Sequence, residues 1–127
     1  MSKPPVIAIV DDDRAVREAL YDLLQVEGLP ARMFENGADY LADAQCLEFG
    51  CIITDVRMPD VDGLTLQRRL RACGSVIPVI FITSSVHEGT RERALSDGAA
   101  AWFTKPVAHE ELLLELRAAL KRVEGRR

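Results

Sequence analysis

Three short stretches of the chain are continuously apolar, and they constrain the fold more than any other feature of the sequence. They span residues 6–10, 51–54 and 79–82, are rich in β-branched side chains, and are bounded by polar or turn-forming residues. A strand that alternates apolar and polar residues has one face in water, whereas an uninterrupted apolar run indicates a strand covered on both faces. The sequence therefore predicts a sheet that lies between two layers of helices.

Segments with helical spacing separate these runs. Two weaker strands, at residues 31–34 and 100–103, bring the expected number of strands to five. Apolar side chains recur every three or four positions in residues 13–27, where Gly28 is expected to end a helix, and again in residues 109–122. Alternating strands and helices predict a single α/β domain: a doubly wound, flavodoxin-like parallel sheet of order 2-1-3-4-5 with helices on both faces.

The composition is that of one ordinary globular domain. Of the 127 residues 48% are hydrophobic, and the formal net charge is −4 without an evident basic face, which argues against a nucleic-acid partner. We expect the domain to span residues 6–122, with residues 1–5 as an N-terminal extension and residues 123–127 as a tail or the start of a linker. That organisation leaves no room for a helix-turn-helix after the last helix.

The sequence shows no signal for secretion, for a membrane span or for a disulfide framework. The first apolar stretch ends at Asp11, which makes it too short for a signal peptide or a transmembrane helix. The three cysteines, Cys46, Cys51 and Cys73, lack the spacing of a zinc site or of paired disulfides. We therefore expect a cytoplasmic protein in a reducing compartment.

Carboxylates follow two strands that a doubly wound sheet places side by side. The first strand ends at Asp11-Asp12-Asp13 and the third at Asp55. Ligands bind beyond the carboxyl ends of such strands, at the point where the strand order reverses. Clustered carboxylates repel one another unless a cation neutralises them, and oxygen ligands without His or Cys favour Mg²⁺. The sequence thus predicts a Mg²⁺ site, with Asp11 and Asp12 paired as metal ligands.

A hydroxyl group and an ammonium group are expected at the same edge. Thr83, followed by Ser84, ends the fourth strand, and Lys105-Pro106 follows the fifth. A carboxylate nucleophile, Mg²⁺, a hydrogen-bond donor and a cation together meet the needs of in-line phosphoryl transfer. Asp55 stands alone at its strand end and is the expected phosphoryl acceptor. We expect the bond before Pro106 to be cis, which proline tolerates and which would aim Lys105 into the crevice.

Four motifs stand at these strand ends: Ile9-Val10-Asp11-Asp12-Asp13, Thr54-Asp55-Val56-Arg57-Met58-Pro59 with Asp62-Gly63, Ile82-Thr83-Ser84, and Lys105-Pro106. In this combination the sequence resembles the receiver domain of bacterial two-component response regulators. The resemblance extends over about residues 6–122. The wording of the second motif is most similar to receivers of nitrogen-fixation-type regulators.

The resemblance implies that a sensor histidine kinase or a phosphotransfer protein passes its phosphoryl group to Asp55. Mg²⁺ would be bound by Asp12, Asp55 and the backbone carbonyl of Arg57, and Asp11 would act through metal-bound water. Lys105 would contact the phosphoryl group. Such a chain is a signalling switch and not a turnover enzyme, although it can promote its own phosphorylation and dephosphorylation.

The resemblance also implies a conformational response. Thr83 would move toward the phosphoryl group, and an aromatic residue, here Trp102, would change rotamer with it. Residues 86–97 carry few large apolar side chains, so we expect that helix to be thinly buried. We expect a phosphorylation-dependent protein contact, with a second copy or an output protein, on helix 86–97, the edge around Trp102 and helix 109–122.

Structural explanations exist for single residues. Asp13 fits a helix N-cap, and Asp55 precedes a turn that alone could explain it. His87 and His109 lack a carboxylate and nucleophile around them and are expected to be solvated.

Three other functional classes fit less well. Haloacid-dehalogenase-type phosphohydrolases carry their nucleophile in D-x-D, whereas Asp55 is followed by Val56-Arg57 and no residues remain for a cap domain. A flavodoxin-like cofactor binder needs a Gly, Ser and Thr loop after the first strand, where the triple Asp would repel a phosphate. A receiver-like protein that switches without phosphate would be expected to lack part of the acidic pocket.

Overall fold

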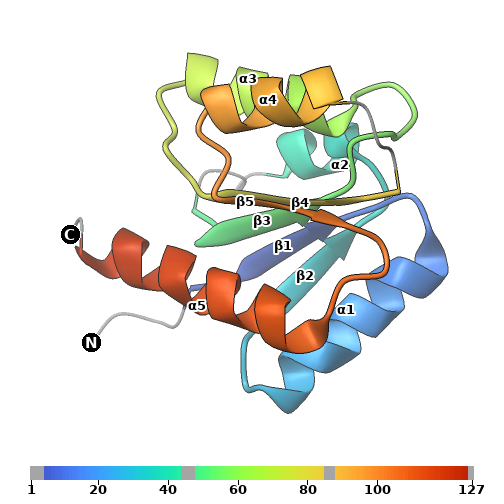
Figure 1. Cartoon of the computed structure of the whole chain (residues 1–127), viewed down its shortest axis with the longest axis vertical. Coiled ribbons are helices and arrows are strands. Elements are labelled where there is room, and N and C mark those ends of the chain that lie inside the picture. Colours follow the sequence, from blue (N-terminus) through green and yellow to red (C-terminus); the bar gives the residue numbers. More distant parts are fainter. Residues whose placement is uncertain (1–4, 44–47, 85–87, 126–127) are drawn as a thin grey trace.

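The computed structural model describes residues 5–43, 48–84 and 88–125 (Figure 1). Its five strands form one parallel sheet of order β2-β1-β3-β4-β5, which confirms the predicted topology. The strands are β1 (Ile7–Val10), β2 (Ala31–Phe34), β3 (Cys51–Thr54), β4 (Val79–Thr83) and β5 (Ala101–Thr104). The helices are α1 (Arg14–Val26), α2 (Gly37–Ala42), α3 (Gly63–Ala72), α4 (Glu88–Ser96) and α5 (His109–Gly125).

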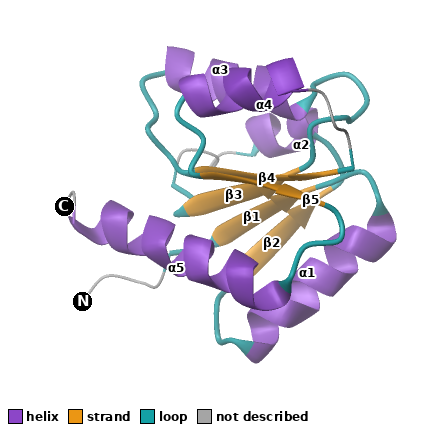
Figure 2. Ribbon diagram, in the orientation of Figure 1, coloured by secondary structure: helices purple, strands orange, loops and turns teal. Residues whose placement is uncertain are grey.

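The sheet separates two hydrophobic cores. Helices α2, α3 and α4 cover one face, and α1 and α5 cover the other (Figure 2). Successive side chains of a strand point to opposite faces, so Ala8 and Val10 join the first core while Ile7 and Ile9 join the second. Every residue of β1, β3 and β4 is buried, as the continuous apolar runs predicted.

Helix α1 begins and ends at the expected signals. The Asp13 side chain accepts hydrogen bonds from the amides of Ala15 and Val16 and so caps the N-terminus, which confirms its capping role. Gly28 has a φ of 72° and stands just past the C-terminus, where a left-handed residue lets the Leu29 amide bond back to the Leu24 carbonyl. The helix therefore starts two residues after the end of the acidic pair.

Two predicted boundaries differ from the structure. Helix α5 continues to Gly125 instead of ending at residue 122, because half-buried Val123 extends its apolar stripe. Strand β5 is shifted by one residue from 100–103, because Thr104 pairs in register with Thr83.

Helix α4 is attached to the rest of the molecule mainly at its C-terminal end. Ala94 is its buried hydrophobic residue among the described side chains, as expected for a thinly buried helix. Residues 85–87, including His87, lie outside the described residues. Two α3 side chains reach over: Gln67 Nε2 donates to the Ala94 carbonyl at 3.1 Å, and Arg71 Nε donates to the Asp97 carbonyl at 3.0 Å. These bonds join the ends of α3 and α4.

The described cysteines are unpaired. Cys51 and Cys73 are free thiols, and Cys46 lies outside the described residues. Burial raises the pKa of the Cys51 thiol to about 12. Within the described ranges, no helix has the length and apolar character needed to cross a membrane.

Candidate functional site

The carboxylates of Asp11, Asp12 and Asp55 meet at the carboxyl edge of the sheet. Val10 pairs in register with Thr54 across β1 and β3, so Asp11 and Asp55 leave the sheet at the same level. Asp11 and Asp55 are buried, with 2% and 7% of their surface exposed, whereas Asp12 is exposed. One oxygen from each carboxylate lies within 4.8 Å of the other two. The strand order thus assembles the predicted acidic cluster.

The turn between β1 and α1 holds Asp11 in place from two sides. Its carboxylate Oδ1 accepts a hydrogen bond from the Asp13 amide at 2.8 Å. Its backbone carbonyl accepts one from Arg17 Nη1, also at 2.8 Å. The sequence analysis did not identify Arg17; its only signal is its place six residues after Asp11, early in the helix that follows.

Backbone amides hold one oxygen of the Asp55 carboxylate. Oδ1 accepts a hydrogen bond from the Val56 amide at 2.6 Å and a longer one from the Arg57 amide at 3.4 Å. The next turn passes close beneath, because the Gly63 amide donates to the Val56 carbonyl at 2.7 Å. A Cβ at Gly63 would overlap the Asp55 carbonyl oxygen, which explains why glycine follows Asp62 in the motif.

Lys105 bridges the two buried carboxylates. Its Nζ lies 2.8 Å from Asp55 Oδ2 and 3.4 Å from Asp11 Oδ2. The Lys105–Pro106 peptide bond is cis, as expected, and the Lys105 amide donates to the Thr83 carbonyl at 2.9 Å. The structure therefore brings the predicted ammonium group into contact with the predicted phosphoryl acceptor.

The electrostatics of the site follow from burial and from this bridge. Burial raises the pKa of Asp11 and the nearby Asp55 charge adds to the rise, although the Asp13 amide and Lys105 oppose it. Burial alone would lower the pKa of Lys105, but its hydrogen bond to Asp55 and the charges of both carboxylates outweigh that effect and raise it. Three oxygen ligands with excess negative charge fit a hard divalent cation such as Mg²⁺.

The remaining predicted residues lie around this cluster. Thr83 is buried at the end of β4, and Ser84 is exposed directly after it. Trp102 is half-buried in β5, and its ring centroid lies 5.5 Å from that of Phe81. His109 is exposed at the start of α5, as expected for a solvated residue.

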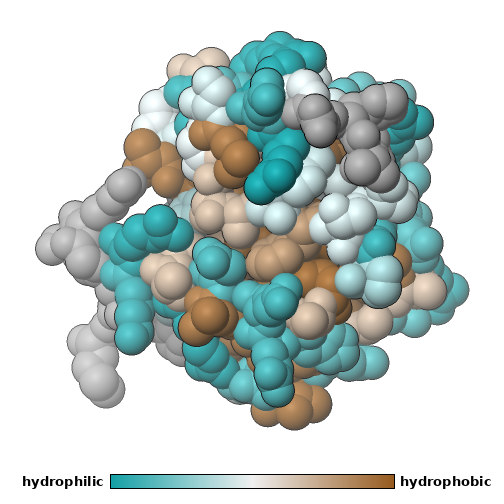
Figure 3. Space-filling view, in the orientation of Figure 1, coloured by the Kyte–Doolittle hydropathy of each residue, from teal (hydrophilic) through white to brown (hydrophobic). Residues whose placement is uncertain are grey.

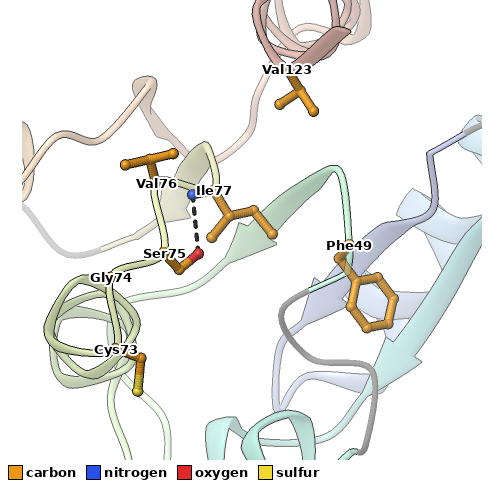
Figure 4. Close-up of a pocket in the computed structure, with 7 residues that line it drawn as sticks. All are labelled: Phe49, Cys73, Gly74, Ser75, Val76, Ile77 and Val123. Atoms are coloured by element: carbon orange, nitrogen blue, oxygen red, sulfur yellow. Dashed lines mark hydrogen bonds between the residues drawn. The ribbon is translucent and has the colours of Figure 1, made fainter. Parts of the chain in front are cut away.

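Two pockets lie outside the cluster. A groove of about 400 Å³ between α1 and the start of α5 opens beside Lys105 and gives this edge an apolar border. A second pocket, of about 380 Å³, includes residues on either side of the sheet's amino edge, among them Phe49, Ile77 and Val123 (Figure 4). Its one polar contact in the view is the bond from the Ile77 amide to Ser75 Oγ. It offers no charged group of the kind that phosphoryl chemistry needs.

Comparison with known proteins agrees with this geometry. The sequence profile described as "Response regulator receiver domain" matches residues 7–117. The chain is 45% identical over 116 residues to the response regulator protein TodT of Pseudomonas putida, an alignment that covers 91% of this chain and 51% of TodT. It is 37% identical over 119 residues to the response regulator MprA of Mycobacterium sp. (strain KMS), covering 94% and 52%. The chain spans about half the length of these curated relatives.

Solved structures show the same relationship. The structure titled FixJ-N superposes with a TM-score of 0.84 at 30% identity, covering 95% of this chain and 96% of that chain. The chemotaxis protein CheY4 of Vibrio cholerae gives a TM-score of 0.82 at 27% identity, covering 92% and 99%. With the strand order, the acidic edge and the profile match in agreement, the chain belongs to the receiver domain family of two-component response regulators.

Proposed function

We propose that this chain is a phosphorylation-dependent switch that takes a phosphoryl group from a histidine kinase or a phosphotransfer protein onto Asp55. The observation that carries the proposal is the bridge in which Lys105 Nζ contacts both Asp55 Oδ2 and Asp11 Oδ2. It supports phosphoryl transfer because it sets a fixed cation beside a buried carboxylate nucleophile. The chain is thus a signalling protein and not a turnover enzyme.

The contacts of Asp55 suggest how the transfer proceeds. Two backbone amides hold Oδ1, so Oδ2 is the oxygen that we assign to the attack on phosphorus. As the new O–P bond forms, the P–N bond to the donor imidazole breaks, and its electron pair stays on the imidazole nitrogen. Lys105, now beside Oδ2, would then turn its ammonium toward the oxygens of the transferred group.

The acidic cluster supports a role for Mg²⁺. Asp11, Asp12 and Asp55 would hold the ion together with the backbone carbonyl of Arg57, and Asp11 would do so through water. When bound, Mg²⁺ neutralises charge on the phosphoryl oxygens in the transition state. The chain's own part is to hold the carboxylates in place before the metal arrives.

The surface formed by α4, β5 and α5 is our proposed output face. Leu95 in α4 and Leu114 in α5 are 43% and 71% exposed, and half-buried Trp102 lies on the strand between the two helices. Figure 3 shows brown and tan surface in the middle of this view, with hydrophilic residues above and below it. Such an apolar centre with a polar border supports a protein partner, either a second copy or an output protein.

Phosphorylation of Asp55 can be tested with a small donor. The wild-type chain, incubated with acetyl phosphate and Mg²⁺, should gain one phosphoryl group by intact-mass spectrometry and lose it to hydroxylamine. Chelation of the metal should prevent the gain, and Asp55→Asn should abolish it. Asp60→Asn, an exposed Asp in the same loop, serves as the matched control and should behave as wild type. Equal phosphorylation of the Asp55→Asn variant would disprove the assignment.

A further inference from the structure

Arg17 is an arginine of α1 whose side chain points inward to the acidic edge. Only 11% of its side-chain surface is exposed. Nη1 donates to the Asp11 carbonyl at 2.8 Å, and Nη2 lies 3.9 Å from Glu35 Oε1, in the segment between β2 and α2. The guanidinium therefore connects the end of β1 with the loop that follows the neighbouring strand.

The position of Arg17 couples the acidic turn to the start of the helix. The Arg17 amide donates to the Asp13 carbonyl at 3.0 Å and so closes the first turn of α1. The side chain of the same residue holds the carbonyl of Asp11, two residues earlier. The Asp11–Asp13 turn is thus fixed by one residue through both its backbone and its side chain.

We propose that Arg17 is a positioning residue for the metal site, because its bond to the Asp11 carbonyl fixes the turn that presents Asp11 and Asp12 toward Asp55. The proposal rests on the proposed Mg²⁺-dependent function. The planar guanidinium suits this task, since it can bond the Asp11 carbonyl and face the Glu35 carboxylate at once in a fixed fork. Residues that orient metal ligands without touching the metal commonly affect metal affinity strongly.

Positioning and simple electrostatics predict opposite signs. A cation near a divalent metal site repels the metal, so removal of the Arg17 charge would tighten Mg²⁺ binding if charge alone mattered. If Arg17 instead holds the turn, its removal loosens Asp11 and Asp12 and weakens binding. The sign of the change in the Mg²⁺ dissociation constant therefore separates the two explanations.

The test compares Arg17→Met, Arg17→Lys and a matched control, Arg14→Met. Arg14 belongs to the same helix, but its side chain is 80% exposed and pairs with Glu18. Calorimetric titration with Mg²⁺ should show binding weakened roughly tenfold in Arg17→Met and less in Arg17→Lys, and changed less than twofold in the control. Circular dichroism checks that each variant is folded.

A second readout needs no metal. In the metal-free protein, the Asp13 amide donates to Asp11 Oδ1, so its hydrogen exchange, followed by NMR, reports whether the turn is held. It should be faster in Arg17→Met than in wild type or in the control. Unchanged exchange together with unchanged or tighter Mg²⁺ binding would overturn the positioning role. If wild type itself bound no Mg²⁺, the proposed function would fail instead, while the amide measurement would still decide what Arg17 does to the turn. If Arg17→Met did not fold, Arg17→Lys would decide the same two measurements.

Discussion

At the scale of single residues, Asp11 carries the main electrostatic cost of the site. Burial is the largest cause of its raised pKa, and the Asp55 charge adds to it. A carboxyl group whose pKa is higher in the folded than in the unfolded chain lowers the stability of the folded state when it is ionised. The charge that prepares the site for a metal therefore opposes folding in the metal-free protein.

Replacing Asp11 with Asn should stabilise the metal-free protein at pH 7. We expect a Tm higher by about 3–5 °C, corresponding to about 1 kcal/mol for a chain of this size. The cost of the ionised Asp11 is fully present above its raised folded pKa and disappears as the pH falls below the unfolded value of about 3.9. The difference between variant and wild type should thus shrink from pH 7 toward pH 4.

Urea denaturation with a chelator present, at both pH values, measures this difference. Asp22→Asn, an exposed Asp of α1, is the matched control and should leave the free energy of unfolding unchanged. A variant less stable than wild type at pH 7 would show that the bonds of Asp11 to Lys105 and to the Asp13 amide outweigh its burial.

Sequence reasoning could find the charged residues of the site but not the groups that hold them. Asp11, Asp55 and Lys105 were predictable because parallel strands bring their ends to one edge, and the structure places them in contact there. Arg17 was not, because its partner is a backbone carbonyl, and any residue type can supply one. The amides that hold Asp55 Oδ1 left no signal in the sequence for the same reason.

At the scale of elements, α4 is anchored at one end. Arg71 of α3 donates to the carbonyls of Asp97 and Gly98 just after α4, and also to those of Ser75 and Ile77 before β4. One guanidinium thus ties together the segments that enter β4 and β5. Movement of α4 would therefore have its fixed point near the C-terminal end of the helix.

The two α3 side chains that reach α4 should differ in their effect on stability. Arg71→Met leaves several backbone carbonyls without their donor and should lower the free energy of unfolding by about 2 kcal/mol. Gln67→Leu should change it by less than about 1 kcal/mol, because the Ala94 carbonyl keeps its bond from the Ala99 amide. In addition, Gln67 Oε1 is buried without a hydrogen-bond partner among the described residues, so the substitution removes an unfavourable group.

Urea denaturation gives both values, and hydrogen exchange of the Asp97 and Ala99 amides locates the effect. Arg69→Met, an exposed position of α3, is the control. Equal losses in the Arg71 and Gln67 variants would contradict this account of the anchor.

Thr83 and Trp102 share one face of the sheet. Trp102 pairs in register with Phe81, and Thr83 follows Phe81 by two residues, so all three side chains point toward α4. If phosphorylation draws Thr83 toward Asp55, space opens beside Trp102 and its indole ring can turn inward. The half-buried indole is the only one in the chain and reports this change directly.

We expect Mg²⁺ with beryllofluoride, a phosphoryl mimic, to change the tryptophan emission beyond the effect of Mg²⁺ alone. Thr83→Ala should reduce that difference to less than half while Mg²⁺ binding persists. A spectrum that stays constant although Asp55 is demonstrably occupied would show that Trp102 keeps one packing in both states.

Short elements escaped prediction for a physical reason. Helix α2 has six residues, too few to show a helical period, and it depends on the Asn36 side chain, which accepts a hydrogen bond from the Asp39 amide at 2.7 Å. The long apolar stripes of α1 and α5 gave clear periodicity. Element type was thus readable where burial imposed a pattern.

At the scale of the whole molecule, the strand order was predictable because burial ranks the strands. Continuous apolar runs cannot lie at a sheet edge, where one side stays open, so β1, β3 and β4 had to be interior. The mixed strands β2 and β5 then had to be the edges, and they are only partly buried. Tertiary ties such as those of Arg71 could not be predicted, because they join backbone atoms of distant segments.

Mg²⁺ should stabilise the entire domain, because the metal binds the folded arrangement of three carboxylates from separate strand ends. At ten times its dissociation constant it should add about 1.4 kcal/mol, or about 3–5 °C in Tm. Thermal denaturation with increasing Mg²⁺ measures this gain. Asp12→Asn should remove most of it, whereas Asp39→Asn, an exposed Asp of α2, should not. A gain that is the same in all three proteins would indicate a metal effect elsewhere on the surface.

The contact of Lys105 with two carboxylates makes it a counter-ion that belongs to the chain. A dissolved Na⁺ or K⁺ ion near the acidic edge is diluted with its solution, whereas a tethered ammonium stays at a high effective concentration in any buffer. Monovalent salts therefore have little to displace at Asp55 and Asp11. The arriving divalent metal joins the resident cation instead of replacing it, so the site should keep its readiness for phosphate across wide changes in ionic strength.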